Sequence, residues 1–467
     1  MAERAWQDEY RARMRSAEDA AALIQGGDTL YTPIGGDAET LLHALLPRII
    51  ELNEPIKIRA CSPRLAHDWF ADDFTWLNIE LGIEIFAGTV GRGALQSLRS
   101  DYTPNLFSTQ FKIYDERRGY VEPIDVFATA CTPPDAEGYV DFGGLPWHKG
   151  DFVRRARTSI LEVVPWLPRC RTTERVHVTE VTAFLETQIL ERPRLVRRDP
   201  PEEAVAVAGF VNQIIEDGDT IQIGAGRTAT FVAAGGAFEG KHDLGWHSEI
   251  TPSNVLPWMM DGTINSSRKT LDRGLAVTTS VNPDTPETDE WVANSGLIET
   301  RPVREVNAIP VIAAQERMCS INNAFQVDLT GQICSESRGT TVYNGTGGQP
   351  EFHIGAFIAP DGKAITVLPS TFEGGQRSRI VPLIDDGSFV TVPRSFADYV
   401  VTERGIARLA GKSQRQRAEE LIAIAHPDHQ AELRRARQRQ FFPAGGAGMS
   451  ESAAPAEIEA RPTAAGD

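Results

Sequence analysis

Two glycine-rich stretches of the sequence could approach a ligand. Residues 345–348 read Gly-Thr-Gly-Gly after Asn344, and residues 224–226 read Gly-Ala-Gly before Arg227 and Thr228. Glycine loses more conformational entropy on folding than other residues, so such clusters indicate positive φ angles or a backbone that must come close to another group. Each stretch taken alone could also be an ordinary turn, which for residues 345–348 would be a tight turn between two strands.

Glu249 lies between these two stretches and could perform covalent chemistry. A carboxylate held in an apolar cleft has a raised pKa and can act as an acid, a base or a nucleophile. The alternative is a solvated outer face, because glutamate is mostly exposed in proteins. His247 could contact Glu249 from the same side of a strand, or it could simply be packed. The apolar residues around Glu249 in the sequence are Trp246, Ile250, Val255, Leu256, Trp258, Met259 and Met260.

The elements that must position these residues follow an α/β plan that occurs twice. Residues 17–45 and 204–234 each combine helical apolar spacing, Gly-Asp-Thr, a short apolar strand, a glycine-containing loop and a second helix. Residues 124–143 and 318–337 each give an apolar strand, a polar turn and a strand that begins with glycine. Two matches in the same order predict an α/β protein with two similar open domains.

The boundary between the two domains is expected in residues 191–203, where apolar periodicity lapses and prolines discourage a continuous element. We therefore predict a first α/β domain at residues 1–195 and a second, which carries Glu249, at residues 200–442. Residues 443–467 are rich in Ala, Gly and Pro and poor in bulky apolar side chains, which predicts a disordered tail.

Composition restricts the possible partners. The formal net charge of −17 argues against nucleic acid and anionic membranes, because both require Lys and Arg to neutralise phosphates. The first residues lack a signal-peptide pattern and no segment approaches the ~18 apolar residues of a membrane span, so we expect a cytoplasmic protein. The five cysteines are widely spaced without Cys-x-x-Cys, so we expect neither a disulfide framework nor a metal site.

Five stretches taken together are specific to one family: GWHSEI, VDLTGQICSES, YNGTGGQPEF, STFEGGQRSRIVP and VTERGIARLAGKSQRQRAEELIAIAHPDH. In order and spacing they resemble the acetyl-CoA hydrolase/transferase family, the group of 4-hydroxybutyrate and succinyl-CoA:acetate CoA-transferases. The similarity extends from about residue 8 to about residue 442. The resemblance implies two α/β domains with the active site in the cleft between them. It also implies an acyl-CoA:carboxylate CoA-transferase that forms a covalent glutamyl-CoA thioester.

The resemblance also implies roles for individual residues. Glu249 matches the nucleophilic glutamate of the family. Backbone N–H groups around Ala225 and Gly348 are candidates to stabilise the tetrahedral oxyanions, which makes Gly348 a second candidate catalytic residue. Coenzyme A is a substrate in this chemistry, so we expect no permanently bound cofactor. The positions that match CoA-binding residues are Gly224, Ala225, Gly226, Arg227, Thr228, Asn344 and Gly348.

Two departures from the family pattern concern the substrates. Ile250 and the residues after it replace a common Ser-Asp-Gly, which predicts a reshaped acyl pocket. Glu373 stands where family members have a lysine that contacts CoA, which predicts weaker or differently posed CoA binding. The expected ligands are an acyl-CoA and a small carboxylate, and the expected assembly is a homodimer.

Two alternatives to a CoA-transferase remain at this point: an acyl-CoA hydrolase that uses the same glutamate and, more distantly, a non-catalytic acyl-CoA-binding protein. A transferase must exclude water from its covalent intermediates. The large apolar residues near Glu249 and the second glycine-rich stretch could form such a dry pocket, or they could be ordinary core. They are Trp246, Trp258, Met259, Met260 and Phe352.

Overall fold

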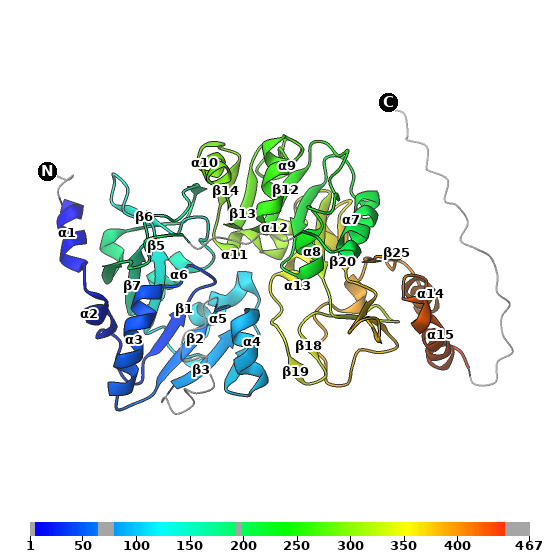
Figure 1. The fold of residues 1–467 in the computed structure, drawn as a ribbon, viewed down its shortest axis with the longest axis horizontal. Helices are drawn as coiled ribbons and strands as arrows, with labels where there is room; N and C mark the ends of the chain where they lie inside the picture. Colours follow the sequence, from blue (N-terminus) through cyan, green and yellow to red (C-terminus); the bar gives the residue numbers. More distant parts are fainter. Residues whose placement is uncertain (1–4, 64–78, 193–198, 444–467) are drawn as a thin grey trace.

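The structure of the protein is a computed structural model that describes residues 5–63, 79–192 and 199–443. The predicted tail lies outside the described residues except for Pro443, and so does the middle of the predicted linker. Two α/β halves lie beside each other, the first half (residues 5–192) in blue to cyan and the second half (199–443) in green to orange-red (Figure 1).

The first half is built on a seven-stranded parallel sheet with the order β10-β7-β5-β1-β2-β3-β4. A small antiparallel pair, β6 (Tyr139–Asp141) with β9 (Arg175–His177), lies beside it. The strands of the sheet are β1 (Thr29–Thr32), β2 (Ile56–Ala60), β3 (Ile79–Glu84), β4 (Ser100–Thr103), β5 (Val126–Cys131), β7 (Thr158–Val163) and β10 (Ala183–Glu186). The helices are α1 (Ala5–Arg13), α2 (Ala17–Ala21), α3 (Glu39–Glu51), α4 (Gly88–Gln96), α5 (Gln110–Glu116) and α6 (Lys149–Arg155).

The second half is built on a nine-stranded sheet with the order β25-β24-β20-β15-β11-β12-β13-β14-β8, in which only the pair β24–β25 is antiparallel. Its edge strand β8 (Arg171–Thr172) comes from the first half of the chain. The other strands are β11 (Thr220–Ile223), β12 (Gly245–Thr251), β13 (Ala276–Val281), β14 (Ile298–Thr300), β15 (Met318–Asn323), β20 (Lys363–Val367), β24 (Tyr399–Thr402) and β25 (Gly405–Arg408).

The helices of the second half lie before, between and after its strands along the chain. Ser413 caps α14 and forms a capping box with Gln416. Among the residues described, no helix is both long and apolar enough to cross a membrane. The helices are α7 (Glu202–Ile214), α8 (Arg227–Phe231), α9 (Leu256–Met260), α10 (Pro286–Asn294), α11 (Val303–Val306), α12 (Ile309–Ala313), α13 (Gln349–Ile358), α14 (Gln414–Ala423) and α15 (Pro427–Phe441).

The predicted duplication is confirmed at the level of strand order. The order β10-β7-β5-β1-β2-β3-β4 of the first sheet recurs as β24-β20-β15-β11-β12-β13-β14 in the second. The first predicted repeat supplies the central strands β1 and β11, and the second supplies their neighbours β5 and β15. The fold is therefore α/β with two similar open sheets, as the sequence predicted. The exact domain boundaries stay a prediction.

The central strands are buried on both faces, although their sequences mix apolar residues with Thr, Ser and Gln. β1, β5, β11 and β13 are buried along their whole length. A parallel sheet covered by helices on both faces requires such strands, because neither face meets water. The carboxyl ends of the strands and the loops that follow them are thus the places where side chains can reach a ligand.

Candidate active site

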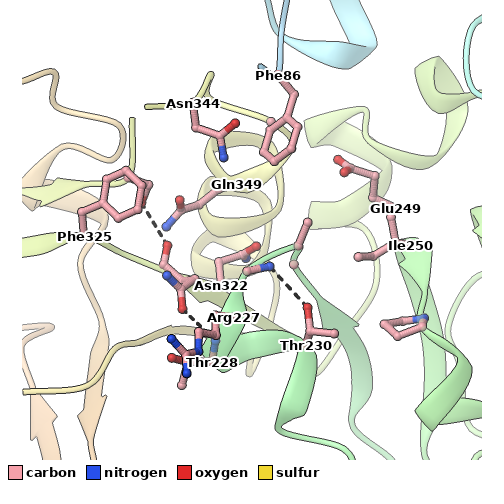
Figure 2. Close-up of a pocket in the computed structure, with 18 of the residues that line it drawn as sticks. Phe86, Arg227, Thr228, Thr230, Glu249, Ile250, Asn322, Phe325, Asn344 and Gln349 are labelled. Carbon is pink, nitrogen blue, oxygen red and sulfur yellow. Dashed lines mark hydrogen bonds between the residues drawn. The ribbon is translucent and has the colours of Figure 1, made fainter. Parts of the chain in front are cut away.

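A cavity of about 830 Å³ is lined by residues of both halves. The second half contributes Glu249 and both glycine-rich stretches. Figure 2 shows the side chains of Glu249, Phe86, Asn344 and Gln349 around this space, with Phe86 coming from the first half. The lining residues of the first half are Ile34, Ser62, Phe86, Arg92, Phe107 and Trp147.

Glu249 is located near the carboxyl end of β12, a strand between β11 and β13 in the middle of the second sheet. The residue is 9% exposed. Asn307 donates a hydrogen bond of 2.7 Å from Nδ2 to Oε2 of Glu249. Burial raises the pKa of Glu249 to about 8, the nearby Glu351 carboxyl acts in the same direction, and the Asn307 hydrogen bond opposes both. The buried reading of Glu249 is confirmed, and the solvated one is wrong.

A second carboxyl group lies beside Glu249. Glu351, in the first turn of α13, accepts a hydrogen bond of 3.1 Å from the same Nδ2 of Asn307. Its other oxygen accepts from the backbone N–H of Ser108 at 2.9 Å and from the Ser108 hydroxyl, so this contact joins the two halves. Burial raises the pKa of Glu351 to about 7. One amide therefore connects two buried carboxyl groups.

Gly348 lies directly against the Glu249 carboxyl group. A Cβ atom at this position would be 1.9 Å from Oε2 of Glu249 and 2.5 Å from Nδ2 of Asn307. At Gly345, a Cβ would be 1.7 Å from the Ile85 carbonyl oxygen. The expectation of a close backbone approach is confirmed at both glycines, because no side chain fits at either position.

The loop that contains Gly348 opens a helix. Gly348 is the N-cap of α13, so the tight turn between two strands, which was the alternative, is wrong. The first N–H groups of a helix have no acceptor within the helix. These donors are therefore available beside the Glu249 carboxyl group, where a negative charge would be stabilised.

The first glycine-rich stretch also leaves no room for side chains at two of its glycines. A Cβ at Gly224 would be 2.1 Å from Oδ1 of Asn322, and one at Gly226 would be 2.6 Å from Cβ of Asn323. The Thr228 N–H donates to Oδ1 of Asn323 at 3.3 Å (Figure 2). The residues that the sequence selected as catalytic or CoA-binding all line this cavity, namely Gly224, Ala225, Gly226, Arg227, Thr228, Glu249, Asn344 and Gly348.

His247 is packed in the core and donates no hydrogen bond to Glu249. Its Nε2 donates to the Val306 carbonyl oxygen at 2.8 Å, and its ring lies 6.1 Å from that of Phe352. Burial lowers the pKa of His247 to about 3. The ring is therefore neutral and belongs to the core, which confirms the packed alternative.

Of the two alternatives for the large apolar residues near Glu249, the dry pocket is wrong and core packing holds for four of the five, because none of them lines the cavity. Trp246 and Met259 belong to the core of the second half, Trp258 packs against that core, and Phe352 belongs to a smaller cluster. Met260 is 36% exposed. Side chains alternate along a strand, so Trp246 and Glu249 point to opposite faces of the sheet. The apolar wall comes instead from Ile250 and from the first half.

The sequence missed several residues of the site. No motif in the sequence marked Asn307, because it is a lone polar residue between two short helices. Glu351 stands in one of the five quoted stretches, YNGTGGQPEF, but no role followed from it there. Ser108 and the cavity-lining residues of the first half lie far from Glu249 in the chain, and no periodicity or motif connects them.

Relatives of known name cover almost the whole chain. The sequence is 35% identical over 441 residues to the succinyl-CoA:cyclohexane-1-carboxylate CoA transferase of Geobacter metallireducens. This alignment covers 94% of this chain and 98% of the relative. It is 37% identical to the 4-hydroxybutyrate coenzyme A transferase of Clostridium kluyveri, over 76% of this chain and 82% of the relative. The chain belongs to the acetyl-CoA hydrolase/transferase family. The C-terminal domain profile of this family matches residues 285–437.

A solved structure agrees with this membership. RipA from Yersinia pestis superimposes with a TM-score of 0.84 at 28% identity, over 93% of this chain and 99% of RipA. The chain is thus an enzyme of the CoA-transferase type, as its resemblance to the family predicted. Within the described residues, no group of three or more His, Cys, Asp or Glu side chains could hold a metal ion.

Proposed function

We propose that this enzyme is an acyl-CoA:carboxylate CoA-transferase that works through a covalent glutamyl-CoA thioester on Glu249. The observation that carries the proposal is the Glu249 carboxyl group at the cavity wall, 9% exposed and in direct contact with Asn307 and the Gly348 backbone. A protein that only bound acyl-CoA would gain nothing from a buried carboxyl group at this place, since burying it is unfavourable. Named relatives of this chain are CoA-transferases, which supports the same reaction class.

The reaction begins when an oxygen of ionised Glu249 attacks the thioester carbonyl of the acyl-CoA. The C–S bond breaks and leaves an acyl-glutamyl anhydride and the CoA thiolate. The thiolate then attacks the Glu249 carbonyl of the anhydride, which releases the first carboxylate and leaves glutamyl-CoA. An acceptor carboxylate attacks this thioester and expels the thiolate again. Attack of the thiolate on the new acyl carbonyl gives the new acyl-CoA and regenerates Glu249.

The surroundings of Glu249 fit a nucleophile that must be ionised but reactive. Burial keeps its pKa near 8, so the ionised form is more basic than an exposed carboxylate and a better nucleophile. Asn307 stabilises the ionised form through its hydrogen bond to Oε2. Glu351 lies on the other side of the same amide and holds Asn307 in place. Asn307 and Glu351 are positioning residues in this proposal.

Each step passes through a tetrahedral oxyanion, and backbone donors are suited to stabilise it. We assign this role to N–H groups around Ala225 and Gly348, which line the cavity from its two glycine-rich stretches. Donors fixed in this way need no reorganisation during the reaction, and one can contribute roughly 3–4 kcal/mol. The close fit of Gly348 against Glu249 keeps one donor beside the reacting carboxyl group.

The acyl side of the cavity favours transfer over hydrolysis. Ile250, the residue after the nucleophile, packs against the apolar cluster of the first half to which Ile34, Phe107 and Trp147 belong. All four line the cavity together with Phe86. An apolar wall excludes water from an anhydride and a thioester, both of which water can hydrolyse. The homodimer and the cytoplasmic location stay predictions of the sequence.

The proposal is tested by mass spectrometry and by product analysis. Incubation with acyl-CoA should add the mass of CoA to the peptide that contains Glu249, and Glu249→Ala should abolish both the adduct and turnover. Thiol release from acyl-CoA should require an added carboxylate, with a new CoA ester as product. Equal thiol release with and without an acceptor, with no new ester across a panel of acids, would make the protein a hydrolase.

A further inference from the structure

A cluster of arginines surrounds one phenylalanine in the second half. Phe372 lies on β21 (Thr371–Phe372), which pairs with β22 (Arg377–Ser378). The guanidinium carbon of Arg338 is 3.7 Å from the centre of the Phe372 ring, and those of Arg377 and Arg379 are each 5.1 Å from it. Cation–π contacts of this kind hold guanidinium groups in place without neutralising their charge.

The positive charge of this cluster is poorly compensated. Burial lowers the pKa of Arg379 to about 10, and the neighbouring charges of Arg338 and Arg227 act in the same direction. Among the described residues, the one ion pair recorded for the four arginines joins Arg338 to Glu373, at 3.7 Å. Such a concentration of positive charge is notable in a protein with a net charge of −17, because it attracts anions to one place.

The cluster adjoins the cavity that contains Glu249. Arg227, Arg379, Phe372 and Glu373 line the cavity, and Arg338 contacts two of these residues, Phe372 and Glu373. The Glu373 side chain is 52% exposed, whereas Glu249 is 9% exposed. The cavity therefore extends from a buried carboxyl group to a partly open, positively charged end. A long substrate with a reactive group at one end and negative charges at the other matches this arrangement.

We infer that the arginine cluster (Arg227, Arg338, Arg377 and Arg379) binds the phosphate groups of the CoA substrate, and that Arg338 exchanges Glu373 for phosphate when CoA binds. The inference rests on the proposed function, which places the CoA thiol at Glu249. The phosphates of CoA are separated from its thiol by the pantetheine arm, so they must lie away from Glu249. Guanidinium groups match phosphate oxygens in geometry as well as in charge.

This inference changes the expected role of Glu373. The sequence suggested that Glu373 weakens CoA binding by its own negative charge. The ion pair indicates instead that Glu373 acts through Arg338, because it pairs with the Arg338 guanidinium group in the free enzyme. Breaking that pair is part of binding, so Glu373 reduces affinity only as long as Arg338 is present.

The decisive experiment measures the binding of CoA, dephospho-CoA and pantetheine by isothermal titration calorimetry. Arg338→Gln should weaken CoA about tenfold, since a charge-assisted contact is lost, and should leave pantetheine binding unchanged. Arg408→Gln, the same substitution at an exposed position of β25 outside the cavity lining, is the matched control and should change neither. A loss with CoA alone assigns Arg338 to the 3′-phosphate, and a loss with dephospho-CoA as well assigns it to the diphosphate; both outcomes support the inference.

Glu373→Gln provides the second arm. It should tighten CoA binding several-fold, with no effect on pantetheine, and this gain should disappear in the Arg338→Gln background because the two residues act as a pair. The inference is overturned if Arg338→Gln leaves CoA binding unchanged, or if it weakens pantetheine as much as CoA.

Failure of this inference can be told apart from failure of the proposed function. The binding measurements can be repeated on Glu249→Ala, in which transfer is absent by design. If the parent enzyme binds CoA no more tightly than pantetheine, the cluster does not bind phosphate, whereas turnover that depends on Glu249 would still support the transferase. If CoA binding depends on Arg338 but no carboxylate accepts CoA, the inference stands and the proposed function is wrong.

Discussion

The two halves of the molecule share a strand order but place different side chains at the same position of it. The threonine of the repeated Gly-Asp-Thr pairs with Lys57 in the first half and with Gly245 in the second. Four residues after Lys57 stands Cys61, directly after the end of β2, and four residues after Gly245 stands Glu249, within β12. Duplication thus supplied two equivalent positions at the ends of two sheets, and only one of them carries a carboxyl group.

The surroundings of these two positions also differ. Cys61 is fully buried, its sulfur accepts from Nε2 of Gln110 at 3.7 Å, and burial raises the pKa of its thiol far above the usual range. A thiol of this kind is inert, because only the thiolate is a nucleophile. Glu249 instead reaches a large cavity and contacts Asn307 and Gly348. The shared fold thus provides the position, and the side chain and its contacts provide the chemistry.

The largest expected difference between the halves is catalytic. Glu249→Ala should lower turnover by at least about 10³-fold, because the nucleophile is lost. Cys61→Ala, the matched change at the equivalent position of the first half, should leave turnover within a few-fold of the parent. Steady-state transfer rates for both variants, with circular dichroism to verify folding, measure the contrast. Comparable losses in the two variants would break the distinction drawn between the halves.

The next effect concerns the backbone that faces the nucleophile. Gly348→Ala places a Cβ where Oε2 of Glu249 now lies, so the carboxyl group must move. A displacement of ~1 Å at a reacting group can cost ~10²-fold in rate, and we expect kcat to fall by about that factor. Gly119→Ala in the first half is the control, because a Cβ there meets nothing within 4 Å. Unchanged kcat in Gly348→Ala would contradict the geometry described for this site.

A third effect is on the pH dependence. Since Glu249 must be ionised to attack, kcat/KM should rise with pH, with a midpoint near its pKa of about 8. Glu351→Gln removes a neighbouring carboxyl group that raises this pKa, so the midpoint should move to lower pH. Cys61→Ala should leave the midpoint where it is. An unchanged midpoint in Glu351→Gln, or a shifted one in Cys61→Ala, would show that another group controls the profile.

The smallest expected effect is on stability. The folded protein holds a proton on Glu249 up to a pKa of about 8, while the unfolded chain releases it near the ordinary value of 4.5, so the parent loses stability as pH rises between these values. Glu249→Gln removes this loss and should raise Tm at pH 8 by on the order of a few degrees. At pH 4 the gain should vanish, as thermal denaturation at both pH values can test.

Cys61→Ala should act in the opposite direction in the same experiment. It opens a small cavity in a packed core and removes the Gln110 contact, so Tm should fall. The fall should depend little on pH, because the thiol stays neutral in this range. A stabilising effect of Cys61→Ala with the pH dependence of Glu249→Gln would mean that the two positions are more alike than their surroundings indicate.

The sequence determined the features of this protein that are local in the chain. Apolar strands, turn residues and helix caps fix each α/β unit, and their repetition in the same order predicted two similar halves. The two glycine-rich stretches marked positions at which the structure leaves no room for a side chain. The family resemblance selected Glu249 from the many glutamates. These residues could be found because a motif of adjacent residues identifies each of them.

Only the tertiary structure decided what surrounds Glu249. Asn307 reaches Glu249 across 58 positions of the chain, and Ser108 reaches Glu351 across 243. Contacts over such separations leave no periodic pattern, because each partner fits its own local element. The misplaced dry pocket has the same origin: residues adjacent to Glu249 in the sequence alternate to the other face of the sheet or pack under it, while its apolar wall comes largely from the other half of the molecule.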